Sequence, residues 1–197
     1  MRIALTGGIA CGKTTAAAVF AKHGCATLST DALAHAVLDS APVAAQLRTR
    51  YGTGVFAPDG TVSRRALGEI VFADGTEKDW LENLVHPEVN RRWQARLAAE
   101  PGADWLVEIP LLFEKKLETG FDFTVCVHAT QETQLRRMAS RGWDAQQAQS
   151  RLQAQWPLEE KVRRADFCLF NEGSLLFLEQ QILALLSLAR RQPIRRL

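Results

Sequence analysis

Near its amino terminus the chain reads Gly7-Gly8-Ile9-Ala10-Cys11-Gly12-Lys13-Thr14. This stretch matches the P-loop pattern G-x-x-x-x-G-K-[ST] at every fixed position. The apolar run Ile3–Leu5 precedes it and an Ala-rich segment follows, so we expect a strand before the loop and a helix from about residue 13. In that setting backbone N–H groups surround an anion, Lys13 reaches the terminal phosphates of a nucleotide, and Thr14 holds Mg²⁺. The stretch therefore predicts a nucleoside triphosphate site, in preference to an ordinary glycine turn.

The composition is that of one globular unit: 197 residues, 47% hydrophobic and 23% charged. A net charge of +2 is too small to indicate nucleic acid or a membrane surface as the main partner. The four scattered cysteines have neither zinc-site nor disulfide-framework spacing and are typical of reduced cytoplasmic thiols. The first strand is expected within a few residues of Met1, and polar residues interrupt the longest apolar stretch, so we expect neither export nor membrane insertion.

Five short apolar runs alternate with helical patterns, which predicts an α/β fold with a five-stranded parallel sheet covered on both faces. The runs are Arg2–Thr6, Cys25–Ser29, Trp105–Ile109, Phe123–Val127 and Phe167–Phe170. Binding groups are expected at the carboxyl ends of these strands. A last helix is expected after an N-cap at Ser174. Its predicted buried residues are Leu175, Leu178, Ile182, Leu185 and Leu186. The basic tail, residues 190–196, is expected to be solvated.

Two segments depart from this alternation. Residues 31–92 carry apolar residues at helical spacing without a convincing buried strand, which predicts a helical insertion. Residues 136–164 are rich in Arg and Gln, which fits either a helical lid or a solvated pair of surface helices. We therefore expect a single domain, with a core of about 1–30, 93–136 and 162–197, an insertion at 31–92 and a lid at 137–161.

Three charged side chains are candidates for chemistry at this sheet edge. Asp31 follows the second predicted strand, where a carboxylate can accept the proton of an attacking hydroxyl, although spacing alone favours a helix N-cap. Arg141 and Arg137 lie at the start of the predicted lid. A guanidinium delivered there would stabilise charge on a transferring phosphoryl group, and solvated helix charges are the alternative.

Further motifs follow the loop in order along nearly the whole chain. The motifs are Leu5-Thr6-Gly7-Gly8-Ile9, Asp31 with Ala34-His35, Asp59-Gly60, Arg64-Arg65-Ala66-Leu67, Phe72, Leu84, His86-Pro87, Pro110-Leu111-Leu112-Phe113-Glu114, Gln134, Arg137, Arg141, Arg151, Gln155, Lys161, Ala165-Asp166, Asn171 and Gly173. On these residues the sequence resembles the dephospho-CoA kinase family. The resemblance implies a P-loop kinase with a helical substrate-binding insertion and a helical lid. It further implies Mg²⁺-dependent transfer of phosphate from ATP to the ribose 3′-hydroxyl of dephospho-CoA. We expect the protein to act in the cytoplasm, as a monomer or weak homo-oligomer.

The resemblance, together with the loop chemistry, gives a set of expected site residues. Catalytic roles are expected for Lys13, Asp31 and Arg141, and a metal-binding role for Thr14. ATP-binding roles are expected for Gly8, Ile9, Ala10, Cys11, Gly12, Lys13, Thr14, Thr15, Arg137, Asn171 and Gly173. Roles in binding dephospho-CoA are expected for Asp31, His35, Arg64, Arg65, His86, Pro110 and Leu111.

Several of these assignments have a plainer alternative. Arg64 and Arg65 could hold the pyrophosphate of the substrate or form an exposed helix face. A lone His such as His86 is more often structural, and Pro87 fits the first position of a helix. Glu108 could support the metal through water or be an ordinary strand residue. Another small-metabolite kinase would share the loop, whereas a GTPase would need an Asn-Lys-x-Asp segment, which the sequence lacks.

The P-loop differs at one point from that of the family it resembles, whose members commonly carry Gly-Ser where this chain has Ala10-Cys11. A positive φ at Ala10 would cost about 1 kcal/mol, so an ordinary backbone conformation is expected there. Cys11 lies beside Lys13 and a helix N-terminus. We therefore expect its thiol to ionise more easily than a free cysteine and to be protected by ATP.

Overall fold

The computed structural model describes residues 1–191, so most of the basic tail lies outside the described residues. The chain divides into two compact units. The first, named here the P-loop unit, comprises Met1–Ser29 and Gly102–Leu197; the second, the helical unit, comprises Thr30–Pro101.

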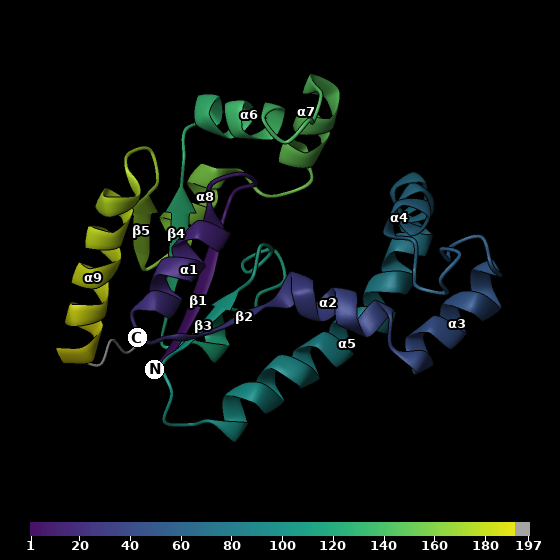
Figure 1. Ribbon diagram of the computed structural model, residues 1–197, viewed down its shortest axis with the longest axis horizontal. Helices are drawn as coiled ribbons and strands as arrows, with labels where there is room; N and C mark the ends of the chain where they lie inside the picture. Colours follow the sequence, from purple (N-terminus) through teal and green to yellow (C-terminus); the bar gives the residue numbers. More distant parts are fainter. Residues whose placement is uncertain (192–197) are drawn as a thin grey trace. The chain divides into compact units, whose positions relative to one another are not determined.

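The P-loop unit contains a five-stranded parallel sheet with the strand order β2-β3-β1-β4-β5 (Figure 1). The strands are β1 (Arg2–Gly7), β2 (Ala26–Ser29), β3 (Trp105–Glu108), β4 (Phe123–His128) and β5 (Phe167–Phe170). Each lies within one residue of a predicted run, and every strand pairing is parallel. The predicted α/β fold and parallel sheet are therefore confirmed.

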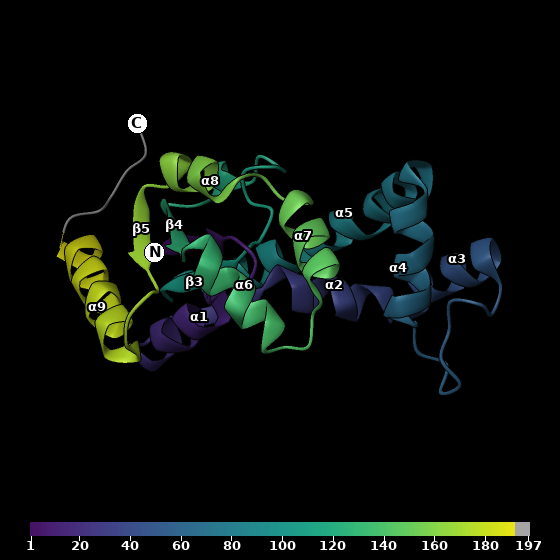
Figure 2. The same ribbon diagram turned by 90° about the horizontal axis from the view of Figure 1, so that it is seen from above.

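The sheet is covered on both faces, which explains why the central strands β1, β3 and β4 are mostly apolar and buried. Helices α1 (Lys13–Lys22) and α9 (Leu175–Arg191) pack against each other, and α8 (Leu158–Arg164) contacts β1 and β4. Figure 2 shows α1 and α8 on opposite sides of the sheet. Between them Ile3, Leu5 and Val125 have no exposed surface, and each such side chain contributes roughly 1.5–3 kcal/mol of burial.

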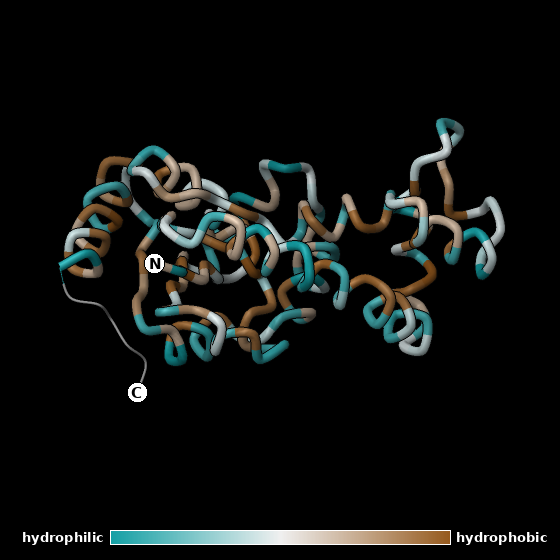
Figure 3. Tube along the Cα trace, turned by 90° about the horizontal axis from the view of Figure 1, so that it is seen from below, coloured by the Kyte–Doolittle hydropathy of each residue, from teal (hydrophilic) through white to brown (hydrophobic). Residues whose placement is uncertain are grey.

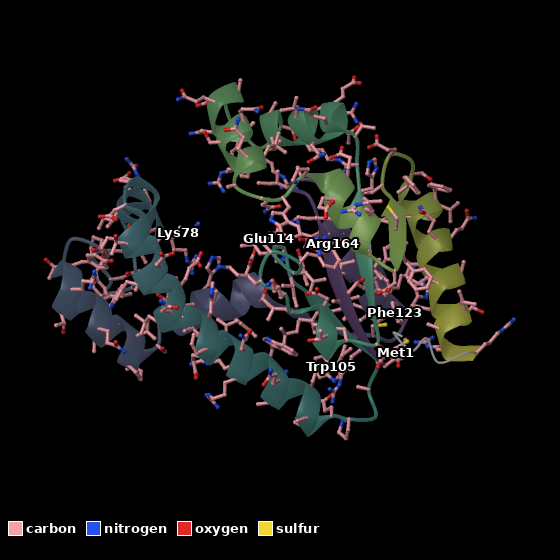
Figure 4. All side chains as sticks on the ribbon, turned by 180° about the vertical axis from the view of Figure 1, so that it is seen from behind. Met1, Lys78, Trp105, Glu114, Phe123 and Arg164 are labelled. Carbon is pink, nitrogen blue, oxygen red and sulfur yellow. The ribbon has the colours of Figure 1, made fainter. Side chains whose placement is uncertain are left out.

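The parallel arrangement brings the carboxyl ends of the strands to one edge. Figure 4 labels Met1, Trp105 and Phe123 together at the opposite end, beside the starts of β1, β3 and β4. At the carboxyl edge Gly7 pairs with Val127, and a β-carbon on Gly7 would lie 2.5 Å from the Val127 carbonyl oxygen. Only glycine therefore allows β1 to stay against β4 where the P-loop begins.

Helix α9 begins as predicted, because the Ser174 hydroxyl accepts a hydrogen bond from the Phe177 N–H at 3.2 Å. Its trace alternates between hydrophobic and hydrophilic residues (Figure 3). The buried positions are Leu178, Ile182, Leu185, Leu186 and Ala189. The prediction for Leu175 is wrong: this side chain is 59% exposed, since it lies in the first turn, before the buried stripe begins.

Two polar contacts of α9 hold it to the rest of the P-loop unit. Gln181 accepts a hydrogen bond from the N–H of Phe170, the last residue of β5, and donates one to its carbonyl oxygen, both at 2.9 Å. Arg190 pairs with Asp104 at 3.0 Å and donates to the His23 carbonyl oxygen at 3.3 Å. The described beginning of the basic tail is thus anchored rather than freely solvated.

The helical unit consists of α2 (Thr30–Leu38), α3 (Ala41–Tyr51), α4 (Arg64–Ala73) and α5 (Gly75–Ala99). Helix α5 packs against both α2 and α4. The expectation that a helix starts at His86-Pro87 is wrong, because α5 continues through Pro87 to Ala99, beyond residue 92. Proline removes one backbone hydrogen bond there, and burial of Val85, Val89 and Trp93 at four-residue intervals holds the helix on both sides.

Between β4 and α8 the chain forms two short helices, α6 (Gln131–Ala139) and α7 (Ala145–Gln153). A capping box between Asp144 and Gln147 starts α7. The interior of this segment is small, with Met138 and Ala148 buried against Ala10 of the P-loop and flanked by Ile9, Trp143 and Leu152. These two helices therefore have little apolar packing to hold them, in contrast to α1, α8 and α9.

Candidate active site

The P-loop occupies the link between β1 and α1, and its lysine folds back over it. The Lys13 ammonium donates hydrogen bonds to the carbonyl oxygens of Gly7 at 3.3 Å and Gly8 at 3.0 Å. Gly12, immediately before α1, has a φ of 94°. Its β-carbon would lie 2.1 Å from the Asn171 side-chain nitrogen, so glycine is required for close approach as well as for backbone conformation. The exposed residues Thr14 and Thr15 form the first turn of α1.

Ala10 adopts a left-handed backbone conformation, with a φ of 57°. The expectation of an ordinary backbone at this position is wrong. An L-residue pays about 1–2 kcal/mol for this conformation, so other contacts must hold the loop in it. Two are visible: the Arg137 guanidinium donates to the carbonyl oxygens of Ala10 and Cys11 at 3.2 and 3.3 Å, and the Asn171 amide donates to Cys11 at 2.8 Å.

Arg137 and Asn171 thus form a clamp on the P-loop. A fourth hydrogen bond closes it, from the Arg137 guanidinium to the Asn171 carbonyl oxygen at 2.8 Å. The sequence placed both residues among those that bind ATP, and the fold brings them to the loop across more than a hundred residues. Gly173 lies two residues further on and is exposed.

Cys11 is fully buried beneath the loop, and this overturns the expectation of an easily ionised thiol. Burial raises its pKa, and the nearby Lys13 ammonium, which lowers the pKa, does not offset that effect. The sequence argument failed because it counted the charge of Lys13 and the helix N-terminus but had no access to burial. Cys11 is accordingly a packing residue.

The loop after β3 lies beside the P-loop strand. The Thr6 hydroxyl donates to the Pro110 carbonyl oxygen at 3.2 Å, and Leu111 follows, partly buried. Glu108, the last residue of β3, is in register with Leu5 of β1. It therefore stands at the carboxyl edge of the sheet, and its support of a metal stays a prediction.

Arg141 lies in the turn between α6 and α7, and it is exposed. Its backbone N–H donates to the Met138 carbonyl oxygen at 3.0 Å. The turn thus holds the Arg141 backbone close to Met138, while the residue as a whole remains exposed.

Five predicted substrate residues belong to the helical unit, and most are exposed. Asp31 and His35 lie one turn apart on α2; since α2 begins at Thr30, Asp31 lies inside the first turn rather than at the N-cap. Arg64 approaches Asp39 at 3.7 Å, and Arg65 pairs with Glu69 at 3.1 Å while remaining 90% exposed. The fifth, a half-buried His86, lies in the middle of α5.

Comparison with known proteins decides the family. Residues 1–176 match the family model for dephospho-CoA kinase. A curated dephospho-CoA kinase from Thermosynechococcus vestitus is 40% identical over 185 residues, which span 92% of this chain and 91% of the relative. The chain belongs to the dephospho-CoA kinase family. Members of this family use ATP to phosphorylate dephospho-CoA, the final step of coenzyme A biosynthesis.

Solved structures agree with the family assignment. A crystal structure from Thermus thermophilus has a TM-score of 0.83 and 38% identity, covering 94% of this chain and 95% of that one. A dephospho-CoA kinase from Campylobacter jejuni has a TM-score of 0.64 and 27% identity over the same fractions. A shikimate kinase from Acinetobacter baumannii, at a TM-score of 0.51 and 15% identity, shares the fold. The predicted family, P-loop kinase fold and ATP-dependent kinase activity are confirmed. Among residues 1–191 no helix is both long and apolar enough to cross a membrane.

The structure contains a buried ion pair that the sequence did not predict, although both of its residues belong to the motifs that match the family. Lys161 of α8 has no exposed surface and pairs with Glu114 at 2.8 Å; Figure 4 labels Glu114 after β3. The same ammonium donates to the Pro110 carbonyl oxygen at 2.7 Å and to the Gln155 side chain at 3.4 Å. Glu114 in turn accepts the Trp156 N–H at 3.1 Å. The pair therefore joins α8 and residues 155–156 to the loop after β3, and periodicity alone gives no signal for it.

A cavity of about 660 Å³ in the P-loop unit was also missed. It lies between Gly8 and Ile9 of the P-loop, the end of β4, and the segment from α6 to the start of α8. The sequence signal was the run of glutamines in residues 146–155, which fits either a helical lid or a solvated pair of surface helices.

Proposed function

We propose that this chain transfers the terminal phosphoryl group of ATP to the ribose 3′-hydroxyl of dephospho-CoA, with the residue roles given below. The observation that carries the proposal is the clamped P-loop, in which Arg137 and Asn171 fix the backbone while Lys13 folds over Gly7 and Gly8. A preorganised loop of this kind binds phosphates without reorganising during the reaction. Family membership supplies the acceptor.

ATP binding is assigned to residues 8–15, with Lys13 as the point charge on the terminal phosphates. Thr14 is exposed in the first turn of α1 and offers one hydroxyl oxygen. That suits Mg²⁺, which takes few protein ligands and completes its shell with phosphate oxygens and water. The ion would neutralise charge on the phosphates. The nucleoside is assigned to the side of the loop formed by Asn171 and Gly173.

Asp31 is assigned as the group that accepts the proton of the 3′-hydroxyl. It follows Ser29, the last residue of β2, by only two residues and is exposed on α2. His35, Arg64, Arg65 and His86 are assigned to binding dephospho-CoA, the arginines through its pyrophosphate. Pro110 and Leu111 are assigned to the acceptor side of the P-loop unit.

Arg141 is assigned to the charge that develops on the transferring phosphoryl group. Its exposed position on the turn between α6 and α7 leaves the guanidinium available to a ligand. We assign residues 137–161 as a lid that excludes water, and residues 31–92 as the substrate-binding insertion. The small apolar interior of α6 and α7 supports the first assignment.

The test is a coupled assay of ADP release, with dephospho-CoA, AMP, adenosine or shikimate as the acceptor. We expect dephospho-CoA alone to stimulate ADP release, and mass spectrometry to find one added phosphate on the ribose. Lys13→Met should abolish the stimulation. Equal stimulation by AMP or shikimate would assign the chain to a different acceptor.

We further propose that the chain acts in the cytoplasm as a monomer or weak homo-oligomer, without a nucleic-acid partner. The net charge of +2 supports the last point, since nucleic-acid binding usually needs a strongly basic surface. Light scattering at micromolar concentration tests the oligomeric state, and a stable oligomer at that concentration would contradict it.

A further inference from the structure

The cavity beside Gly8 has a lining unlike that of a polyphosphate site. Its polar side chains include five glutamines, at positions 131, 134, 149, 153 and 155, whereas its single charged residue is the carboxylate of Glu159. No Lys or Arg is among the described residues that line it. Phosphates are usually held by cationic side chains as well as backbone N–H groups, so this chemistry favours an uncharged ligand.

One glutamine of the lining is buried, and its orientation is fixed. Gln134 is 4% exposed, and its amide nitrogen donates to the Ala129 carbonyl oxygen at 3.0 Å. That carbonyl can only accept a hydrogen bond, so the nitrogen must face it and the side-chain oxygen must face the other way. The oxygen is buried and has no hydrogen-bond partner. It lies on the side of Gly8, 3.1 Å from where a β-carbon on that residue would be.

A second residue that lines the cavity also has a buried polar atom without a hydrogen-bond partner. Nδ1 of His128, at the end of β4, is buried and has no hydrogen-bond partner. Buried polar atoms without partners cost about 1–3 kcal/mol each, and two of them in residues that line one cavity are consistent with a ligand that supplies hydrogen bonds. Apolar residues also line the cavity, among them Ile9, Leu152, Trp156 and Leu158.

We propose that this cavity binds the pantetheine arm of dephospho-CoA. The inference rests on the proposed function, which supplies the substrate. The arm is an uncharged chain with two amides, a hydroxyl and a pair of methyl groups, and so it matches a lining of carboxamides and aliphatic side chains. Its N–H and O–H groups serve the oxygen of Gln134, and the glutamines of α7 donate to its carbonyl oxygens. The volume of about 660 Å³ is in the range of pockets that bind small molecules.

The experiment compares two acceptors, dephospho-CoA and the β-methyl ester of ADP, which keeps the adenosine and pyrophosphate but lacks the arm. The readout is the ratio of their kcat/KM values, because damage to the P-loop affects both acceptors and cancels. We expect the wild-type chain to prefer dephospho-CoA by at least about tenfold. Gln134→Met should reduce this preference about fivefold to tenfold, mainly through the KM for dephospho-CoA, as expected for one lost hydrogen bond in a buried site.

A second variant keeps the test informative if Gln134→Met fails to fold. Gln149 and Gln153 line the cavity from α7 and are exposed, so the double variant Gln149→Leu with Gln153→Leu should fold and should also reduce the preference. Gln180→Met, on the exposed side of α9, is the matched control and should leave the preference unchanged.

The outcomes separate this inference from the proposed function. If the wild-type chain phosphorylates both acceptors with equal kcat/KM, the proposed function stands and the pantetheine site is wrong. The site is also wrong if the preference survives in the glutamine variants that fold. If neither acceptor is phosphorylated, the proposed function fails and the inference fails with it.

Discussion

Two charged side chains of the P-loop unit are used differently from exposed ones in the helical unit. Arg137 and Lys161 of the P-loop unit turn inward to partners far along the chain, where Arg137 bonds the carbonyl oxygen of Ala10 and Lys161 bonds that of Pro110. In the helical unit the ion pair of Arg65 with Glu69 is local and exposed, and that of Arg92 with Glu88 is local and half-buried. Inward bonds fix a backbone before the ligand arrives, whereas exposed charges remain available to the ligand itself.

The largest expected effect is on kcat, and it comes from an exposed charge of the helical unit. Asp31→Asn should lower kcat about 10²-fold to 10⁴-fold, because the variant can no longer accept a proton, while the KM for ATP changes little. Asp31 is exposed, so the free energy of unfolding should change by less than about 0.5 kcal/mol. Steady-state kinetics and urea unfolding measure the two quantities. Asp79→Asn, an exposed carboxylate of α5, is the control, and unchanged turnover in Asp31→Asn would remove the residue from the proton-accepting role.

The next effect comes from the P-loop unit and concerns stability. Lys161→Met leaves Glu114 as a buried, unpaired carboxylate, which should lower the free energy of unfolding by about 3–5 kcal/mol. Arg65→Met, which breaks an exposed pair of the helical unit, should change it by less than about 0.5 kcal/mol. Urea unfolding of both variants measures the difference, and similar values would erase the contrast between the units.

A double variant shows whether the loss comes from the unpaired charge. Lys161→Met combined with Glu114→Leu removes both charges and should recover most of the stability, since apolar side chains can replace a buried ion pair. If the double variant is as unstable as Lys161→Met alone, the cost lies in lost packing or in the hydrogen bond to Pro110 instead.

A smaller effect on stability is expected when alanine is replaced by glycine, and the same replacement can be compared in both units. Ala10→Gly relieves a left-handed backbone worth about 1–2 kcal/mol but adds unfolded-state freedom worth about 0.4–1 kcal/mol, so stability should rise by about 0.5 kcal/mol. Ala36→Gly, at an exposed position inside α2, should lower it by about 0.5–1 kcal/mol. Thermal unfolding measures both, and a destabilising Ala10→Gly would show that Arg137 and Asn171 do not hold a strained loop.

The smallest effect is a pH dependence within the helical unit. Hydrogen bonds from Arg50 and Tyr51 lower the pKa of Glu77 to about 2, from an ordinary value of 4.5. Its stabilising contribution is therefore present above pH 4.5 and is lost as the pH falls from 4.5 towards 2. The melting temperature should fall less steeply over this range in Glu77→Gln than in the wild type, with Glu69→Gln as the exposed control. Parallel curves for Glu77→Gln and the wild type would contradict the prediction.

The sequence predicted features that short segments encode. The P-loop, the five strands and the cap at Ser174 depend on neighbours a few residues apart, and each was found where expected. The backbone conformation of Ala10 and the easy ionisation of the Cys11 thiol were predicted wrongly, because both depend on surroundings contributed by distant segments. Arg137, for example, is 127 residues from Ala10.

The predicted site residues also divide into those whose placement follows from the strand pattern and those whose placement depends on distant contacts. Arg137, Asn171 and the P-loop are brought together by the sheet, whose strand pattern is readable from sequence. Pro87 misled the reading of α5, because a single missing hydrogen bond is outweighed by buried side chains that only the folded helical unit reveals. The roles assigned to Asp31 and Arg141 stay predictions, since they depend on contacts with a substrate.

The contact between Gln181 and Phe170 has a consequence for how this molecule avoids other copies of itself. Within residues 1–191, strand β5 pairs with β4 on one side alone and forms an edge of the sheet. A free edge offers unpaired backbone groups that can recruit a strand from another chain and begin aggregation. The Gln181 carboxamide satisfies both the N–H and the carbonyl oxygen of the last residue of β5, as a peptide group of a neighbouring strand would. One side chain thereby protects the end of the sheet edge from intermolecular strand pairing.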